Sequence, residues 1–372
     1  MRIETLAVHA GAAPDAESGA LAPPIHLSTT FVHPPDASQL SGHLYTRYGN
    51  PTQDRLEEAL VALEGGQAAL VYGSGMAAAA GMMRALQPGH LILADDVYFS
   101  VRTVATELGP RWGMTTSVVD ATDLDALRTA VQPHTRCIWI ETPSNPRLKV
   151  VDIAAVAEIA RAAGALLVVD ATFATPILQR TLELGAHVVL HSCTKYMGGH
   201  SDVLAGALVL AERGDLHGSL LRARTLLGAV ASPLSSWLVM RGLRSLPCRM
   251  EWHCRGAQAV AEALARHPAA LRVHYPGLPT HPGHALAARQ MPRGFGGVLS
   301  FEHRGGRDAA LATASRLRIF TNATSLGGTE SLVEHRASVE GKSSPTPPGL
   351  LRLSVGLEHP DDLVADLEHA LG

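Results

Sequence analysis

The chain has 372 residues, of which 46% are hydrophobic and 17% are charged, and its formal net charge is −3. This composition allows a large core in one or two α/β domains and argues against disorder. The charge gives no reason to expect nucleic acid or a membrane surface as a partner. The four cysteines form no CxxC pair, and we find neither a signal peptide nor a bilayer-spanning stretch, so we expect a cytoplasmic protein.

Composition changes along the chain predict three parts. Residues 1–50 are rich in Pro, Gly and His and are expected to form an irregular arm that contacts a neighbouring subunit. Residues 51–230 alternate short apolar runs with longer helical patterns, which predicts a mostly parallel sheet with helices on both faces. The predicted strands of this part are 68–72, 91–94, 114–118, 137–140, 165–169, 186–190 and 205–210, and the predicted helices are 75–86, 102–108, 124–131 and 153–163.

Residues 231–372 have a different pattern, which predicts a smaller α+β domain. A long apolar helix over 234–246 is expected to bridge the two domains. The other predicted elements are a helix over 255–266, strands over 298–302 and 351–355, and a Pro-rich loop over 343–348.

Two motifs in the first half could bind phosphate. Tyr45 and Arg47 lie in the arm, where an arginine beside a tyrosine can clamp a phosphate or simply form a surface turn. The segment 73–78 (GSGMAA) follows a strand and places backbone N–H groups at a helix N-terminus. It also fits the dinucleotide pattern G-x-G-x-x-A, with Asp95 and Asp96 near the spacing of a ribose-binding acid. A nicotinamide dehydrogenase is therefore the alternative.

Polar side chains follow several of the predicted strands. Tyr98 could stack on a flat ring or be a core aromatic residue. Asn145 lies in a Pro-rich loop and could donate its amide hydrogen to an oxygen of a ligand. Arg352 interrupts an apolar run, so it requires a carboxylate, which a substrate or an internal salt bridge could provide. The histidines show no zinc spacing, and we predict no metal site.

Asp170 and Lys195 follow two apolar strands, 25 residues apart. Ligands bind at the carboxyl ends of such strands in open α/β sheets. A lysine amine there can form an imine with the aldehyde of pyridoxal phosphate, and a carboxylate can keep the cofactor's ring nitrogen protonated. Ser192 and Thr194 place hydroxyl groups suited to a phosphate beside the lysine. This pair makes pyridoxal-phosphate chemistry the preferred hypothesis.

At these residues the chain resembles the Cys/Met-metabolism family of pyridoxal-phosphate enzymes, which includes cystathionine γ-synthase, cystathionine γ-lyase, methionine γ-lyase and homoserine sulfhydrylases. The resemblance runs nearly from end to end. The matching segments are 5–11 (TLAVHAG), 23–25 (PPI), 28–31 (STTF), 45–47 (YTR), 49–52 (GNPT), 63–66 (LEGG), 74–77 (SGMA), 141–146 (ETPSNP), 191–196 (HSCTKY), 199–202 (GHSD), 325–328 (SLGG) and 351–356 (LRLSVG).

The resemblance implies the aspartate-aminotransferase-like fold, known as fold type I, and a homotetramer built as a dimer of dimers. It implies that Lys195 bonds covalently to the cofactor and that Asp170 pairs with its ring nitrogen. Tyr98 would stack on the ring and assist proton transfer. The residues implied to hold the phosphate are Gly75, Met76, Ser192 and Thr194, together with Tyr45 and Arg47 of the neighbouring subunit. The residues implied to hold the substrate carboxylate are Asn145, Ser325 and Arg352.

The sequence departs from the family pattern around the substrate. Members that act on cystathionine usually carry acids where this chain has Leu44 and Thr324, and those acids can meet a distal ammonium group. Ala171 replaces the usual Asn after the ring aspartate, Phe99 replaces Gly after Tyr98, and the lid segment 338–341 reads SVEG instead of SMTH. Leu44 and Thr324 favour a substrate without a distal ammonium group, such as methionine, homocysteine or an acylhomoserine.

The resemblance implies γ-elimination or γ-replacement, or β-elimination, on sulfur-containing or O-acylhomoserine amino acids, in the manner of cystathionine γ-synthase or γ-lyase. The alternatives are a methionine γ-lyase or homoserine sulfhydrylase type of activity. A nicotinamide-binding dehydrogenase and a non-catalytic homologue remain open as alternatives of another class.

Overall fold

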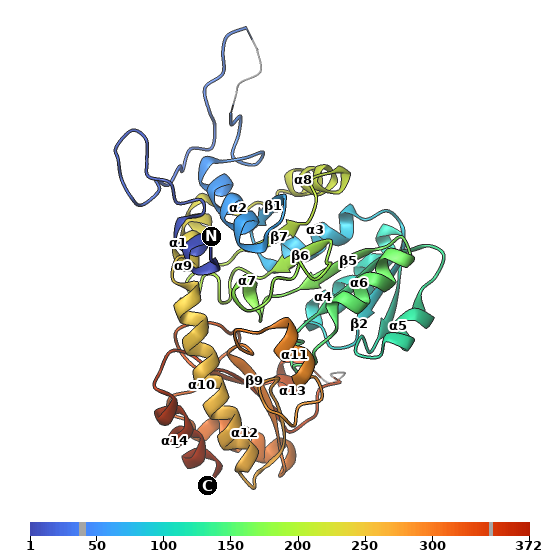
Figure 1. Ribbon diagram of the computed structural model, residues 1–372, viewed down its shortest axis with the longest axis vertical. Helices are drawn as coiled ribbons and strands as arrows, with labels where there is room; N and C mark the ends of the chain where they lie inside the picture. The colour runs from blue at the N-terminus through green and yellow to red at the C-terminus, as the bar shows by residue number, and fades with distance from the viewer. Residues whose placement is uncertain (37–41, 342–344) are drawn as a thin grey trace.

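The computed structural model describes residues 1–36, 42–341 and 345–372. It contains two sheets, one in each half of an elongated molecule, and a long N-terminal arm that projects away from both (Figure 1). The prediction of an α/β fold with a mostly parallel sheet and a smaller C-terminal α+β part is confirmed. Within the described ranges, no helix combines the length and the apolar character that crossing a membrane requires.

The larger sheet has the strand order β1-β7-β6-β5-β4-β2-β3 within the described ranges. Its strands are parallel except for β7, which runs antiparallel to both of its neighbours. Each predicted strand of this part is present, with ends shifted by up to two residues. The strands are β1 (Ala68–Tyr72), β2 (Gly89–Ala94), β3 (Met114–Val119), β4 (Thr135–Glu141), β5 (Leu166–Asp170), β6 (Val188–His191) and β7 (Gly206–Leu210).

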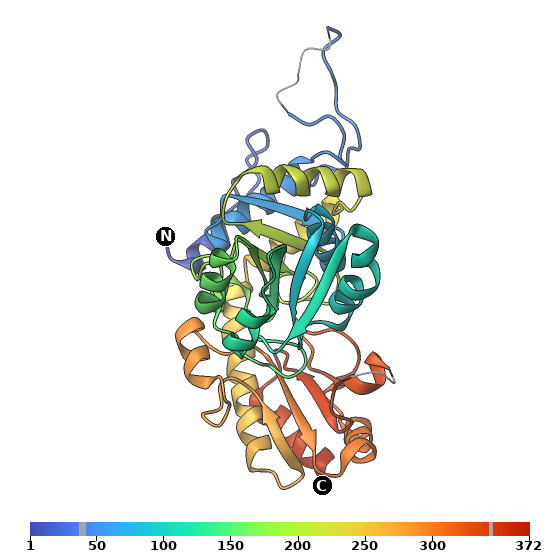
Figure 2. The same cartoon turned by 90° about the vertical axis from the view of Figure 1, so that its right-hand side faces the viewer.

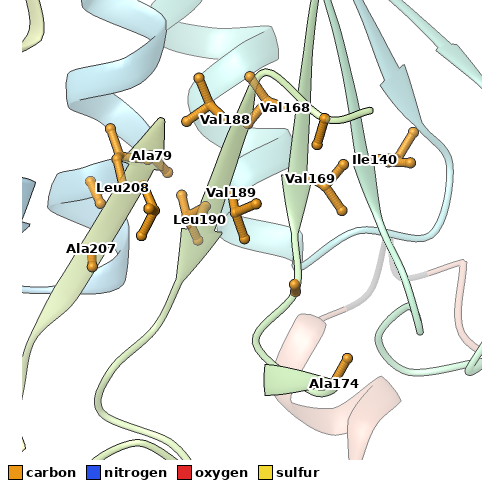
Figure 3. Packing of buried hydrophobic residues seen from close by; sticks show 14 of the residues in the cluster. Ala79, Ile140, Val168, Val169, Ala174, Val188, Val189, Leu190, Ala207 and Leu208 are labelled. Atoms are coloured by element: carbon orange, nitrogen blue, oxygen red, sulfur yellow. The ribbon is translucent and has the colours of Figure 1, made fainter. Parts of the chain in front are cut away.

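Branched apolar residues fill the middle of this sheet. Val168 and Val169 of β5 lie beside Val188 and Val189 of β6, and all four are fully buried (Figure 3). β-Branched side chains favour extended backbone and pack well on a pleated surface, and a sheet buried on both faces reads as a continuous apolar run. The core therefore fixes the ends of β5 and β6, where Asp170 and His191 stand.

Helices cover both faces of the larger sheet, and polar caps start several of them. Asn50 accepts a hydrogen bond from the Thr52 N–H at the start of α2, and Ser74 accepts one from the Ala77 N–H at the start of α3. The helices of this part are α2 (Pro51–Glu64), α3 (Gly75–Ala85), α4 (Phe99–Thr103), α5 (Leu124–Ala130), α6 (Ile153–Ala162), α7 (Thr175–Leu178) and α8 (Asp215–Leu227).

The predicted helix over 102–108 is only partly correct. The α-helix α4 begins earlier, at Phe99, and gives way to a π-helix over Val104–Leu108 and a 3₁₀ helix over Gly109–Trp112. Thr103 and Thr106 bond back to the carbonyl oxygens four residues before them, which competes with the regular ladder.

The smaller sheet has the order β10-β11-β12-β9-β8 within the described ranges and carries its own buried core. The predicted strands over 298–302 and 351–355 are present as β9 and β12. The strands are β8 (Ala270–His274), β9 (Val298–His303), β10 (Thr321–Asn322), β11 (Leu332–His335) and β12 (Leu350–Ser354), and the helices are α11 (His284–Gln290), α12 (Gly306–Arg316), α13 (Arg336–Glu340) and α14 (Pro360–Leu371). Part of the predicted loop 343–348 lies outside the described residues.

The connection between the two halves differs from the prediction. The chain turns at Arg244 and Ser245, so the predicted helix over 234–246 is α9 (Pro233–Leu243). The helix that bridges the halves is α10 (Leu246–Arg266), which absorbs the separate helix predicted over 255–266 (Figure 1). Pro247 is tolerated because it lies in the first turn, where its missing N–H is not needed.

The N-terminal arm is irregular over most of its length, as predicted, but it begins with a helix that the prediction missed. The helix α1 (Ile3–His9) buries Ile3 and Ala7 against the body of the same chain. Beyond it the arm leaves the body, and both views show it extending past α2 and α8 (Figures 1 and 2). The helix was not predicted because its apolar pattern is short and the rest of the arm is rich in proline and glycine.

Candidate active site

A cavity of about 260 Å³ lies where the carboxyl ends of β4, β5 and β6 face the smaller sheet. It brings together most of the predicted site residues, from sequence positions far apart. The lining residues are Ser74, Gly75, Met76, Tyr98, Phe99, Val101, Glu141, Asn145, Asp170, Thr172, Phe173, Leu190, Ser192, Thr194, Lys195, Leu204, Thr324, Ser325, Leu326, Arg336, Val339 and Arg352.

Lys195 enters the cavity from the turn that follows β6. Its Nζ donates a hydrogen bond of 2.6 Å to Ser325 Oγ, and within the described ranges it forms no ion pair. Burial disfavours the charged amine, and the nearby Arg352 guanidinium adds repulsion, so the pKa of Lys195 falls to about 8. A substantial fraction of this amine is therefore neutral, and nucleophilic, near physiological pH.

We expect the cofactor-free protein to take up pyridoxal phosphate at a rate that rises with pH through about 8 and then levels off. Only the neutral amine attacks an aldehyde, and the protonated form dominates below the pKa. Absorbance at a series of pH values after mixing would give the rate. A rate that keeps rising toward pH 10.5, the ordinary pKa of a lysine, would contradict the lowered pKa of Lys195.

The Ser325 backbone is strained at the point where it meets the lysine. Its φ angle is 104°, in a region that non-glycine residues rarely adopt. The Ser325 carbonyl oxygen accepts a hydrogen bond of 3.0 Å from Arg352 Nη2, and its hydroxyl accepts the one from Lys195. Strain of this kind is held where surrounding contacts fix it, commonly at functional sites.

Asp170 and Glu141 end neighbouring strands and lie opposite each other in register. Asp170 Oδ1 accepts a 3.0 Å hydrogen bond from the Thr172 N–H, and within the described ranges its carboxylate has no ion-pair partner. Burial raises the pKa of both acids, and the pKa of Glu141 rises further because Asp170 is close. Both effects favour the neutral form of Glu141, and among the described residues the buried Asp170 carboxyl group faces the cavity without an ion-pair partner.

The start of helix α3 lines the cavity and is suited to an anion. Gly75 and Met76 open helix α3, whose first N–H groups carry partial positive charge. A side chain at position 75 would come within 3.0 Å of Ser192 Oγ, so glycine keeps the space between helix and hydroxyl open. Thr194 also lines the cavity, and its hydroxyl exchanges hydrogen bonds with the Ala205 backbone.

Tyr98 also lines the cavity. Its N–H donates a 2.7 Å hydrogen bond to Glu141 Oε2, which fixes the backbone beside β4. Its ring packs edge-on against Phe99, with the ring centroids 5.0 Å apart. The two aromatic residues therefore form a joint part of the cavity lining.

Arg352 crosses from the smaller sheet into the cavity. Its Nη1 donates to Asn145 Oδ1 at 3.2 Å, and its Nη2 lies 2.8 Å from Glu334 Oε2. The internal salt bridge considered for Arg352 is therefore present. It does not exclude a ligand carboxylate, because Arg352 and Asn145 both line the cavity.

Two predicted residues lie elsewhere. Tyr45 and Arg47 do not line this cavity, and Arg47 instead donates a 3.2 Å hydrogen bond to the Thr225 carbonyl oxygen and packs over the rings of Tyr45 and Tyr48. Their place on the projecting arm means that a single chain cannot bring them to its own cavity in this conformation.

Sequence reasoning missed two charged residues of the site. Arg336 and Glu334 are almost fully buried, and Arg336 lines the cavity. Arginine, glutamate and histidine within residues 334–340 suggest a solvated turn, and Arg352 gives no local hint that it shares a carboxylate with Arg336. The sequence signal that could have indicated burial is the charged Glu334, which directly follows the apolar Leu332 and Val333.

The dehydrogenase hypothesis requires Asp95 or Asp96 to bind a ribose, but both acids are engaged by other residues of the chain. Lys149 Nζ pairs with Asp95 at 2.8 Å, and Asp96 is buried, where it accepts hydrogen bonds from the Ser144 hydroxyl and the Arg147 N–H. Neither acid lines the cavity. Among the described residues, no cluster of His, Cys, Asp or Glu could hold a metal ion.

The residues present fit pyridoxal phosphate. A partly neutral lysine, an unpaired buried carboxylate and an anion-binding helix start lie around one cavity, matching the aldehyde, the ring nitrogen and the phosphate of that cofactor. No single one of these features would select it.

Comparisons with known proteins agree with this fit. A family model described as "Cys/Met metabolism PLP-dependent enzyme" matches residues 4–372. The chain is 47% identical to a cystathionine gamma-synthase from Mycobacterium tuberculosis, over 99% of this chain and 96% of that protein. It is 41% identical to a cystathionine gamma-lyase from Bacillus subtilis, over 100% and 99% of the two chains. The solved structure of a methionine gamma lyase from Micromonospora echinospora, CalE6, superposes with a TM-score of 0.93 at 42% identity, covering 100% of this chain and 99% of that one.

Proposed function

The chain belongs to the Cys/Met metabolism PLP-dependent enzymes, a transsulfuration family, and we propose that it catalyses elimination or replacement at the γ-carbon of a sulfur-containing or O-acylated homoserine-type amino acid. The observation that carries the proposal is the meeting of Lys195, Asp170 and Arg352 around one cavity. These groups could bind, respectively, the cofactor aldehyde, its ring nitrogen and the carboxylate of an amino acid. The nicotinamide dehydrogenase is not retained, because the family is one of pyridoxal-phosphate enzymes.

The cofactor would lie along the cavity with its phosphate at the start of α3. Gly75 and Met76 would donate backbone N–H groups to that phosphate, and the hydroxyl groups of Ser192 and Thr194 would bind it. Asp170 would keep the ring nitrogen protonated, and Tyr98 would stack on the ring. We propose residues 51–230 as the cofactor-binding domain and residues 231–372 as the C-terminal domain that contributes Ser325 and Arg352.

Bound pyridoxal phosphate supplies an electron sink for the substrate carbanion. Arg352 and Asn145 would hold the substrate carboxylate and so orient the bond to the α-hydrogen. Lys195 Nζ would remove that proton as general base, since its lowered pKa leaves the amine neutral, and Ser325 Oγ, 2.6 Å away, orients it. Tyr98 could exchange protons on the side of the leaving group.

Two buried arginines, Arg336 and Arg352, line the cavity, and the end that we assign to the substrate side chain is otherwise mainly apolar. Phe99, Val339 and the uncharged Thr324 line it, and none of these could pair with a distal ammonium group. This favours methionine, homocysteine or an acylhomoserine over cystathionine. Methionine γ-lyase or homoserine sulfhydrylase activity is therefore the second candidate within the same family.

A panel of amino acids tests the proposal and identifies the leaving group. We expect methionine, homocysteine or an O-acylhomoserine to yield ammonia and a 2-oxo acid, or a new thioether when a thiol is supplied, faster than cystathionine does. Ammonia, 2-oxo acid and thiol are measured for each substrate. If protein that holds cofactor, as shown by its spectrum, turns over none of these substrates, the hypothesis of a non-catalytic homologue is favoured.

We also propose a homotetramer, built as a dimer of dimers, in which the arm of one subunit completes the site of another. Tyr45 and Arg47 are partly exposed on that arm, and Leu204, at the cavity lining, leaves 61% of its surface exposed. Light scattering tests this, and an active monomer would contradict it.

We further infer a cytoplasmic location from the unpaired cysteines, which cell fractionation would test.

A further inference from the structure

One carboxylate, Glu334, lies between two buried guanidinium groups. Glu334 on β11 and Arg352 on β12 are register partners in the smaller sheet, so the backbone fixes this pair. Arg336 follows two residues later, as the first residue of α13. All three side chains are no more than 4% exposed.

The two arginines use the same oxygen atom. Glu334 Oε2 lies 2.5 Å from Arg336 Nη1 and 2.8 Å from Arg352 Nη2. Burial alone would favour protonation of Glu334, but the two guanidinium groups outweigh it and lower its pKa. The carboxylate therefore stays ionised, and its negative charge is shared between two cations.

Because Glu334 is shared with Arg336, it neutralises the charge of Arg352 only in part. If Glu334 faced Arg352 alone, the buried pair would carry no net charge, and a substrate carboxylate would have to compete with Glu334 for the guanidinium. With Arg336 on the same oxygen, one negative charge is divided between two guanidinium groups, and Glu340 on Arg336 brings the charge of the whole network to zero. Arg352 therefore has only part of one carboxylate as its partner. Arg352 Nη1 donates a hydrogen bond of 3.2 Å to the neutral Asn145 amide oxygen.

The far side of Arg336 is anchored separately. Its Nη2 pairs with Glu340 Oε1 at 2.9 Å, and its guanidinium lies over the Phe99 ring at 5.8 Å from the centroid. Neither contact involves Arg352, so both fix Arg336 without drawing on the carboxylate that the two arginines share. Substitution of Glu340 thus disturbs Arg336 without removing a contact of Arg352, and it serves as a control.

We propose that Arg336 is a positioning residue for substrate binding: by sharing Glu334, it keeps Arg352 charged and directed at the substrate α-carboxylate. This inference rests on the proposed function, in which Arg352 holds that carboxylate. The role is indirect, so it concerns every amino-acid substrate equally, whatever its distal group.

The test is a double-mutant cycle on the holoenzyme with Arg336→Gln, Glu334→Gln and the two combined. We measure KM, kcat and the inhibition constant of 4-(methylthio)butanoate, which carries the carboxylate of methionine but no amine and so cannot bond to the cofactor. We expect R336Q to raise KM and the inhibition constant about tenfold and to change kcat by less than about threefold, because coupling within one charged network is of this size. With Glu334 already replaced, the Arg336 substitution should change neither constant by more than about twofold.

Two further variants separate the possible failures. E340Q removes an ion pair of Arg336 but none of Arg352, so it should leave both constants unchanged; an increase equal to that of R336Q would overturn the inference in favour of a general disturbance of α13. An R336Q effect that persists in the E334Q background, or that depends on the distal group of the substrate, also overturns it. R352A should raise both constants more than R336Q does. If R352A changes neither constant, the proposed role of Arg352 fails; if R352A raises them and R336Q does not, only this inference fails.

Should R336Q prove too unstable to purify, Arg336→Lys supplies the same test. A lysine keeps the positive charge but lacks the planar fork that reaches both Glu334 and Glu340. We expect R336K to lie between the wild-type protein and the predicted R336Q values. R336K constants equal to those of R352A would contradict an indirect role.

Discussion

Replacement of Lys195 by alanine should abolish covalent cofactor attachment and lower turnover by about 10⁴-fold or more, since the same amine also serves as general base. The chain offers few substitutes for it. Its lysines are Lys149, Lys195 and Lys342. Lys149 Nζ is held between Asp95 and Asp120, at 2.8 Å and 2.7 Å, and although burial opposes the charge, these two partners raise its pKa. Lys342 lies outside the described residues.

Borohydride reduction followed by peptide mass mapping measures the attachment directly. In the wild-type protein we expect the adduct on the peptide that contains Lys195, together with visible absorbance before reduction. Lys149→Ala is the matched control and should keep both signals, because a protonated amine in a salt bridge is not a nucleophile. An adduct on Lys149, on Lys342 or on the amino terminus would refute the assigned cofactor site.

The larger sheet could be predicted from the sequence because each of its strands is a local signal. A run such as Leu166–Val169, buried on both faces, is apolar at every position, and the residue after it marks the sheet edge. The helix α1 and the uninterrupted α10 could not be predicted in this way. Their extents depend on packing against the body of the chain and on whether Pro247 falls at the start of a helix or inside one.

The same difference between local and long-range signals applies to the residues of the site. Lys195, Asp170 and Gly75 stand at ends of strands or starts of helices, so sequence order alone brings them to one edge of the sheet. The sharing of Glu334 by Arg336 and Arg352 depends on the register of β11 against β12, which no local pattern specifies. The arm residues Tyr45 and Arg47 pose a different problem, because the site proposed for them belongs to another copy of the chain.

Asp170→Asn should lower kcat by about 10²–10³-fold, the usual cost of removing one preorganised electrostatic group from an active site. The substitution keeps the size of the side chain and an oxygen that can accept from the Thr172 N–H, and it removes only the negative charge that would face the ring nitrogen. Cofactor content is measured by absorbance in the same samples, so that a loss of rate is not confused with a loss of pyridoxal phosphate.

Glu141 makes this experiment specific, because it is a second buried acid on the next strand, opposite Asp170 in register. Burial and the neighbouring Asp170 raise the pKa of Glu141 well above its ordinary value, which favours its neutral form. Glu141→Gln retains an acceptor for the Tyr98 N–H, now 2.7 Å from Oε2, and leaves Asp170 in place, so kcat should stay within about threefold. Equal losses in the two variants would mean that buried polarity in general, and not the Asp170 charge, supports turnover. A large loss in E141Q alone would exchange the roles assigned to the two acids.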